Sequence, residues 1–298
     1  MQKIRVVLLM MVLCGSSFFV GRVKGEEGLK TSTITKSAIN NKVEEVYKKI
    51  DFGGNAVLSK VVFAKAYQGF LNLKEAGKLS EAQNILSVCD FSLSANTKRL
   101  WVIDLNKNKV IFHTLVAHGQ GTGEEFAVAF SNQENSHQSS YGFYVTEATY
   151  NGDNGYSLKL NGMDRGYNDN AYSRAIVMHG ADYVCDSYIK ENKRLGRSWG
   201  CPAVPRGLAK PIIDKIKDKT CLFIYYPNKN YLASSVWLNK MPKVSEEDLI
   251  REKYQQQLGK EKLAMLETKD AAPAKAQPTE QIADLPEYQG VKLAVGVR

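Results

Sequence analysis

The sequence contains few of the residues that organise small metal-bound or disulfide-rich domains. Its 298 residues include five cysteines and four histidines, and no C-x₂-C or H-x₃-H spacing occurs among them. Zinc sites built from such pairs are therefore not indicated. No internal repeat stands out. Hydrophobic residues at 44% and charged residues at 24% are ordinary globular values, and the length allows one sizeable domain with appendages or two small domains.

The sequence also lacks an apolar run of the roughly 20 residues that a membrane-spanning helix needs. A nearly uncharged stretch over residues 4–20 is short of that length, contains glycine and serine, and is followed by small residues. This layout predicts a secretory signal peptide over residues 1–25, and therefore export to the periplasm or cell envelope. The alternatives are an uncleaved anchor or a lipid on Cys14, for which Leu13 is a poor fit.

A concentrated charge of one sign is absent as well. The formal net charge is +9, and residues 1–25 hold four basic residues and no acidic one, so their removal leaves +5. Basic and acidic residues are interspersed along the rest of the chain. A nucleic-acid partner is therefore not indicated, and an ordinary solvated surface explains the balance.

Four cysteines remain after residue 25. Cys89 and Cys221 lie in apolar, strand-like stretches, and burial as small hydrophobic side chains explains both. Cys185 and Cys201 lie in a more polar segment. In an oxidising compartment these two can form a disulfide, and with His179 they can form a zinc site, so both alternatives stand beside a reactive thiol.

The chain is predicted to begin, after the signal peptide, with a helical preface over residues 26–84. One helix is expected over about residues 36–50. A second places Phe63, Tyr67 and Phe70 on one face, at helical spacing. That apolar face predicts packing against a sheet.

Residues 85–240 have a different pattern and form the predicted catalytic domain. Short stretches rich in β-branched and aromatic residues alternate with connections rich in Gly, Asn and Ser, which predicts a mainly β fold with a largely antiparallel sheet. One helix is expected over residues 207–217. The expected strands are residues 85–89, 100–105, 110–116, 142–146, 156–160, 175–179 and 221–226.

The C-terminal part changes again. Residues 241–268 are charged and predict a helix, whereas residues 269–298 have an Ala/Pro-biased composition with no apolar period. We expect this last segment to be a disordered tail.

A cysteine and a histidine late in the β domain carry the candidate chemistry. The expected strand 175–179 would deliver His179 at its end, with Gly180 starting a loop. Cys201 directly follows Gly200, and a glycine beside a nucleophile admits substrate and frees backbone N–H groups for an oxyanion. Because a thiol reacts as its thiolate, it needs a basic neighbour. We interpret Cys201 as the candidate nucleophile and His179 as its base.

Other side chains near this pair each have two explanations. Ser198 can position the substrate or simply form a turn. Arg197 can pair with a substrate carboxylate or be solvated, and Trp199 can be a pocket wall or part of the core. His118, which precedes Gly119 in a glycine-rich loop, is a rival base.

At these residues the sequence resembles a known family. The pair His179-Gly180 and the motif Ser198-x-Gly200-Cys201 resemble the signature of the L,D-transpeptidase (YkuD-type) catalytic domain. The resemblance covers about residues 90–226. The other stretches that agree are residues 116–119, 130–132, 139–144 and 196–203.

The resemblance implies a β-sandwich-like fold that holds a Cys201–His179 dyad. A backbone carbonyl near Gly180 would orient the imidazole, and backbone N–H groups around Gly200 and Cys201 would hold the oxyanion. It further implies a positioning role for Ser198. Arg197 and Trp199 are the candidate substrate-binding residues.

The implied activity is that of a murein L,D-transpeptidase acting on peptidoglycan tetrapeptide stems. A thioester would form at Cys201 with release of D-alanine, and an amine of another stem would then accept the acyl group in a 3–3 crosslink. No metal or organic cofactor is required. The alternatives are an L,D-carboxypeptidase that hydrolyses the same bond and a cell-wall-binding domain without turnover.

Two positions depart from the family pattern. Many relatives carry a second histidine where this chain has Trp199, and a different pair of residues where Pro202 and Ala203 stand. The dyad is unaffected by these changes. The shape and polarity of the acyl-donor pocket are the properties that they alter.

Overall fold

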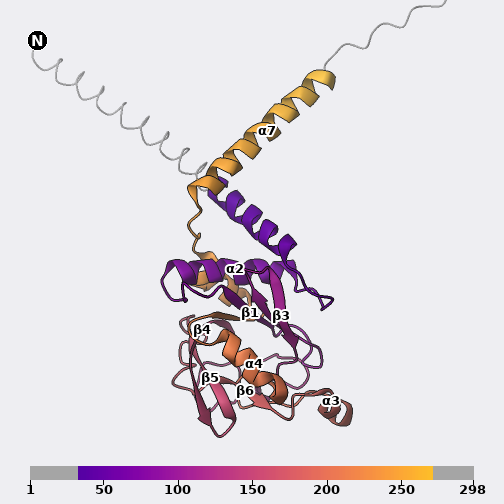
Figure 1. The fold of residues 1–298 in the computed structure, drawn as a ribbon, viewed down its shortest axis with the longest axis vertical. Coiled ribbons are helices and arrows are strands. Elements are labelled where there is room, and N and C mark those ends of the chain that lie inside the picture. Colours follow the sequence, from indigo (N-terminus) through magenta and orange to yellow (C-terminus); the bar gives the residue numbers. More distant parts are fainter. Residues whose placement is uncertain (1–32, 271–298) are drawn as a thin grey trace, which may run out of the picture. The chain divides into compact units, whose positions relative to one another are not determined.

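The computed structural model describes residues 33–270 (Figure 1). The predicted signal peptide and the predicted tail from residue 271 onward lie outside the described residues. The chain divides into two units, one ending at Glu252 and one starting at Lys253. Across residues 33–270, no helix combines the length and the apolar character needed to cross a bilayer.

The described part of the first unit contains eight strands in one sheet, ordered β3-β2-β1-β8-β4-β5-β6-β7. This confirms the predicted mainly β fold. Most neighbouring strands are antiparallel as expected, but β1–β8 and β6–β7 are parallel. The strands are β1 (Ile85–Asp90), β2 (Leu100–Asp104), β3 (Lys109–Thr114), β4 (Gly142–Gly152), β5 (Gly155–Gly162), β6 (Val177–Ala181), β7 (Ala203–Pro205) and β8 (Cys221–Tyr225).

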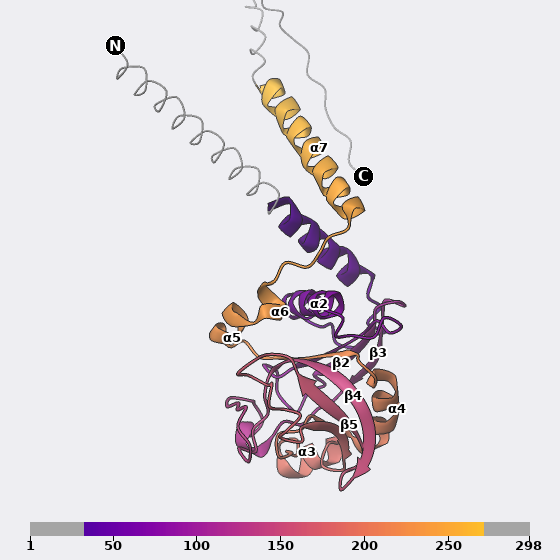
Figure 2. The same ribbon diagram turned by 90° about the vertical axis from the view of Figure 1, so that its left-hand side faces the viewer.

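The sheet bends until its two ends approach each other. Just after β3, the Ala117 N–H donates to the Ala203 carbonyl of β7 at 2.8 Å, and a second bridge joins Gly119 to Ser198. One nearly closed, barrel-like sheet therefore supplies both layers of the expected sandwich. The long β4–β5 hairpin curves across the front of it (Figure 2).

Two helices pack against the sheet. α2 (Lys60–Glu75) packs on β1 and β8 (Figure 1), and α4 (Arg206–Ile216) packs on β5, β6 and β7. Ile212, Ile213 and Ile216 of α4 are fully buried, because their spacing places them on one face. Strands β1 and β8 are buried at every residue since both of their faces are covered.

The helical preface is present where the sequence predicts it. Residues 33–49 are helical, and α2 buries Phe63, Tyr67 and Phe70 as the spacing requires. The first two of these rings stack with their centroids 5.6 Å apart. The sequence prediction of helices packed against a sheet is therefore confirmed for this segment.

The strand that carries His179 differs from the prediction. β6 runs Val177–Ala181 rather than over residues 175–179, so that His179 lies inside the strand and Gly180 is a strand residue rather than the start of a loop. The cause is β7, which pairs in parallel with His179, Gly180 and Ala181 and extends the strand. Ala175, with a φ of +54°, belongs to the preceding turn.

Several short elements were not predicted from the sequence. A strand of three residues such as β7 has no periodicity, because it is defined by its partner rather than by its own pattern. The other unpredicted elements are α3 (Asp186–Asn192), α5 (Lys229–Ser234) and α6 (Val236–Asn239).

The predicted C-terminal helix is also present. α7 spans Glu246–Asp270, so it begins five residues after the predicted start at residue 241 and includes residues 269–270. Ser37 and Asn41 of the first helix both donate to the Glu252 carboxylate at 2.6 Å. The start of α7 is therefore held within the first unit.

A glycine at the contact between α2 and the sheet gives a stability test. A Cβ on Gly69 would lie 2.0 Å from Cζ of Phe143, which stacks on Phe223 at 4.2 Å. We expect Gly69→Ala to lower the free energy of unfolding by about 1–3 kcal/mol through overpacking. Gly207→Ala in α4 is the matched control, because nothing lies within 4 Å of its Cβ and helix propensity favours alanine by about 1 kcal/mol or less. Urea denaturation of both variants checks this; a gain in stability at both sites would contradict it.

Candidate active site

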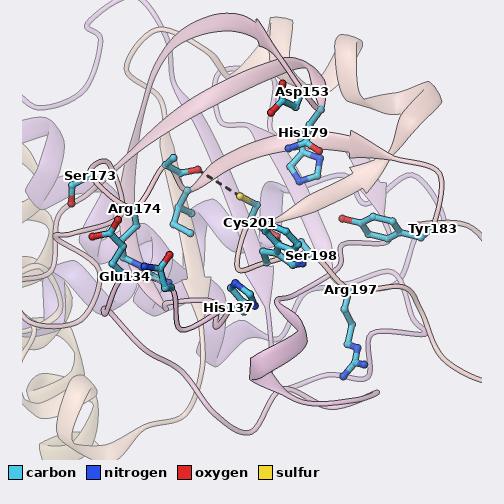
Figure 3. A pocket seen from close by; sticks show the side chains of 15 residues that line it. Glu134, His137, Asp153, Ser173, Arg174, His179, Tyr183, Arg197, Ser198 and Cys201 are labelled. Atoms are coloured by element: carbon cyan, nitrogen blue, oxygen red, sulfur yellow. Dashed lines mark hydrogen bonds between the residues drawn. The ribbon is translucent and has the colours of Figure 1, made fainter.

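One pocket of about 620 Å³ brings together the side chains that the sequence singled out (Figure 3). Both members of the candidate dyad line it, together with the residues around the cysteine motif. It also includes the tip of the β4–β5 hairpin and the loop before β4. Its polar and aromatic lining residues include Glu134, His137, Asp153, Arg174, His179, Tyr183, Arg197, Ser198, Trp199 and Cys201.

Strand β6 positions the Cys201 thiol. The turn that carries Cys201 leads directly into β7, whose Ala203 is in register with His179. The Val177 N–H donates to the Cys201 Sγ at 3.4 Å, and the thiol itself points to the Ala175 carbonyl at 3.8 Å (dashed in Figure 3). The same strand therefore holds the thiol and carries the candidate base.

The His179 imidazole is fixed in one orientation by its own strand. Its Nδ1 lies 3.2 Å from the Gly180 carbonyl, so Nδ1 carries the proton and Nε2 keeps a free lone pair. Within residues 33–270 no hydrogen bond engages Nε2, and the ring lines the pocket. A backbone carbonyl thus stands where a triad has a carboxylate.

Burial keeps both members of the pair neutral at rest. Burial lowers the pKa of His179 below its usual value, although the hydrogen bond to Gly180 opposes the shift. Burial raises the pKa of Cys201, while the Val177 N–H and the charge of Arg174 act in the opposite direction. General-base activation requires a neutral imidazole and a protonated thiol in one site, and both line this pocket.

The turn before Cys201 depends on a glycine. Gly200 has a φ of +121°, and a Cβ there would lie 2.8 Å from the Gln138 carbonyl oxygen. Its own carbonyl accepts a hydrogen bond from Ser139 Oγ at 2.9 Å. Both the backbone angle and the close packing therefore exclude a side chain at this position.

Ser198 ties the turn together from inside. Its Oγ accepts from the Gly200 N–H at 3.1 Å and donates to the Cys201 carbonyl at 2.6 Å. Because the Gly200 N–H is used in this way, it is not available to an oxyanion. Among the described residues, the Cys201 N–H has no recorded partner, which narrows the predicted pair of oxyanion donors to one.

Two predicted substrate-binding side chains have different surroundings. Arg197 donates to the Gly123 carbonyl at 3.0 Å and pairs with Glu124 at 2.7 Å, so its charge is already satisfied. Trp199 is 71% exposed and therefore belongs to the pocket wall rather than to the core. Its indole stacks on the His137 imidazole.

The rival base, His118, is excluded by its position. It is fully buried, and its Nδ1 lies 2.8 Å from a guanidinium nitrogen of Arg99. Burial together with that cation lowers the pKa of His118 to about 4. It does not line the pocket that contains Cys201. We interpret His118 as a neutral acceptor that holds Arg99 in place.

The alternatives for the cysteines can now be compared with the geometry. Cys89, Cys185, Cys201 and Cys221 are all free thiols, so the Cys185–Cys201 disulfide is not formed. Burial raises the pKa of Cys89 and Cys221, which makes both unreactive. Across residues 33–270, no three His, Cys, Asp or Glu side chains are grouped as a metal site would require, which leaves the zinc alternative without a ligand set.

Arg174 is a site residue that the sequence analysis missed. Its guanidinium donates to the carbonyls of Ser131 and Gln138 at 2.8 and 2.7 Å, and its charge lowers the pKa of Cys201. Its position directly before the predicted strand was the signal available in the sequence. The other lining residues, among them His137 and Asp153, lie far away along the chain and gave no local signal.

The sequence of the chain matches a family model for the L,D-transpeptidase catalytic domain over residues 55–225, which is more than half of its length. The chain belongs to the L,D-transpeptidase family. The matched region contains β1 to β8, the candidate dyad and the whole of the pocket. It also begins ahead of α2, which indicates that this helix is part of the family domain. No curated protein matches the chain.

Solved structures of other bacterial proteins resemble this one distantly. The helical cell shape determining protein Pgp2 of Campylobacter jejuni is 15% identical, with a TM-score of 0.33, over 55% of this chain and 57% of that one. Bd1075 of Bdellovibrio bacteriovorus is 16% identical, with a TM-score of 0.31, over 61% and 58%. For an L,D-transpeptidase of Mycobacterium smegmatis the values are 11%, 0.30, 48% and 59%. The chain thus spans less than two thirds of each structure, and the assignment to the family rests on the sequence match.

The hydrogen bonds of Ser198 predict a positioning effect. We expect Ser198→Ala to lower the free energy of unfolding by about 1–3 kcal/mol, because it removes two bonds inside a buried turn. It should also slow alkylation of Cys201 by iodoacetamide, since the turn that presents the thiol loosens. Ser173→Ala is the control: this serine lines the same pocket but bonds only to Asn170. Equal alkylation rates in the two variants would contradict a role for Ser198 in holding the turn.

The pKa shifts predict how the reactivity of Cys201 depends on pH. Because burial raises the pKa of the thiol, its alkylation rate should still be rising above pH 9. In a His179→Gln variant the rate near pH 7 should fall, because the base that accepts the thiol proton is gone. Peptide mapping by mass spectrometry distinguishes Cys201 from Cys185, the other thiol within residues 33–270 that is not fully buried. A plateau below pH 8 would contradict the neutral pair.

Proposed function

We propose that the protein is a cysteine-dependent murein L,D-transpeptidase that is exported to the cell envelope and acts on peptidoglycan tetrapeptide stems. The observation that carries the proposal is the pocket shared by Cys201 and His179, in which the tautomer of the base is fixed by Gly180. Membership of the L,D-transpeptidase family supports the reaction class. The substrate, the nucleophile and the crosslink are inferred from this combination.

The first half-reaction forms a thioester. His179 Nε2 removes the proton from the Cys201 thiol, which must first turn away from the Ala175 carbonyl toward the imidazole. The Sγ attacks the carbonyl carbon of the third stem residue, and the bond to the terminal D-alanine breaks. The D-alanine amine leaves with the proton held by His179. The acyl group is then bound to Cys201.

The oxyanion of this step would be held by the backbone. The Cys201 N–H is unpartnered among the described residues and adjoins the attacking sulfur. One such donor contributes about 3 kcal/mol to lowering the barrier. Ser198 and Gly200 act by fixing the turn from which this N–H points.

The second half-reaction transfers the acyl group. A side-chain amine of another stem attacks the thioester, gives its proton to His179, and the sulfur leaves to be reprotonated. A 3–3 crosslink results. If water attacks instead, the product is a free tripeptide, and the enzyme is an L,D-carboxypeptidase.

Removing the thiol tests the proposal. With disaccharide-tetrapeptide as substrate, the wild-type protein should release D-alanine and form dimers of a tripeptide donor with a tetrapeptide acceptor, which mass spectrometry detects. Cys201→Ala should abolish both products, a loss of at least about 10³-fold, because no covalent intermediate can form. Cys185→Ser should retain activity, since its thiol bonds to Asp182 and Ser187 and does not line the pocket.

The products separate the alternatives. Tripeptide monomers without dimers at high substrate concentration would assign a carboxypeptidase. Unchanged D-alanine release by the Cys201→Ala variant would refute the dyad. A wild-type protein that binds muropeptides but releases no D-alanine would assign a wall-binding domain.

A further inference from the structure

The Trp199 side chain is exposed beside the candidate nucleophile. At 71%, it is the most exposed of the large apolar side chains in the described residues. The other two tryptophans are largely enclosed, with Trp101 bonded to the Ala56 carbonyl and Trp237 to the Met163 carbonyl. An indole left in water at a pocket rim lacks the free energy that burial would supply, so it offers an apolar face that a ligand can cover.

The indole is held as half of a rigid pair. The His137 imidazole stacks on it, with ring centroids 4.9 Å apart and planes 8° from parallel. One face of the indole is therefore covered by protein, and the ring cannot turn into the pocket without breaking the stack. We call these two side chains the ring platform.

The backbone below the ring platform is locked as well. His137 has a left-handed φ of +51°, its carbonyl accepts from the Gly121 N–H at 2.9 Å, and its Nδ1 lies 2.9 Å from Gln120 Nε2. A left-handed backbone at a residue with a side chain costs about 1–3 kcal/mol and persists where its surroundings enforce it. The structure thus holds the imidazole at a specific place under the indole.

The ring platform and the nucleophile belong to one site. Trp199 and Cys201 both line the pocket and are separated by Gly200 alone, so their Cα atoms are at most about 7 Å apart. If the third stem residue reacts at Cys201, two stem residues, one of them linked through its γ-carboxyl, and a lactyl ether separate it from the sugar ring, a span of roughly 15 Å when fully extended and less when folded. The part of the substrate that reaches Trp199 can therefore be the sugar.

We propose that the exposed face of Trp199 stacks on an N-acetylated amino-sugar ring of the glycan strand, and that the ring platform favours glycan-attached stems over free peptides. This inference rests on the proposed function. A pyranose presents C–H groups of partial positive charge along one face, which complements the negative face of an aromatic ring. Exposed polar side chains of Glu134 and Asn135 line the same pocket and can bond sugar hydroxyl or acetamido groups.

A substrate ammonium group is the competing ligand for an aromatic face. The charges of the lining favour neither ligand, because Arg174 repels an ammonium group while Glu134 and Asp153 attract it. An N-acetylated sugar carries no ammonium group, so the binding test with a glycan oligomer distinguishes the two ligands.

The kinetic test compares two substrates that differ in the sugar alone. The measured quantity is kcat/KM for disaccharide-tetrapeptide divided by kcat/KM for the sugar-free tetrapeptide. This ratio should exceed one in the wild type and be about tenfold lower in Trp199→Ala. In Trp199→Phe it should stay near the wild-type value, because the variant keeps an aromatic face. His137→Ala should lower the ratio and His137→Phe should preserve it. A ratio unchanged in Trp199→Ala would overturn the proposal.

A binding test separates this inference from the proposed function. The Cys201→Ala protein is titrated with an N-acetylglucosamine tetramer, and the heat of binding is followed by isothermal titration calorimetry. We expect a saturable change that is lost in the Cys201→Ala, Trp199→Ala double variant. Glycan binding without any turnover in the wild type would refute the transpeptidase and keep the ring platform. Turnover together with an absence of glycan binding would refute the ring platform and keep the enzyme.

Discussion

The parallel pairing of β6 with β7 is the interaction on which the site depends. It sets His179 opposite Ala203 and so places the Cys201 turn beside Val177, whose N–H reaches the sulfur. Neither element could do this alone, because a three-residue strand has no stability of its own. The bridge from Ala117 to Ala203 supports β7 from its other side, so that the approach of the two ends of the sheet also stabilises the turn that carries Cys201.

Most of the fold follows from local patterns in the sequence. Strand-forming stretches such as β1, β2 and β8 are long enough for composition to reveal them, and the face of α2 is visible from the spacing of Phe63, Tyr67 and Phe70. The boundaries of β6 were misplaced because its partner, β7, is too short to recognise. The parallel strand pairs could not be predicted either. The direction of a neighbouring strand depends on the topology of the sheet, and the sequence of residues 85–90 does not indicate it.

The candidate site also combines residues that the sequence marks with contacts that it does not reveal. Cys201, His179 and Gly180 could be found because a motif and a strand mark them, and the structure adds what each contacts. The pairing of Arg197 with Glu124 and the burial of His118 against Arg99 join residues that are 73 and 19 positions apart. No local pattern encodes these contacts, because they form only when separate segments converge. The bond from the Gly200 N–H to Ser198 is local, but it depends on a turn geometry that the sequence does not specify.

The position of β8 has a consequence for how the molecule reaches its native state. This strand is the last of the eight to be synthesised, yet it lies between β1 and β4 and is paired with both. Until residue 225 is available, β1 and β4 expose unpaired edges and the sheet is split into two halves. Because such long-range pairing is slow, the chain has to avoid aggregation by other means until its final strand is inserted, and a shorter product that ends before Cys221 would have no route to a closed sheet.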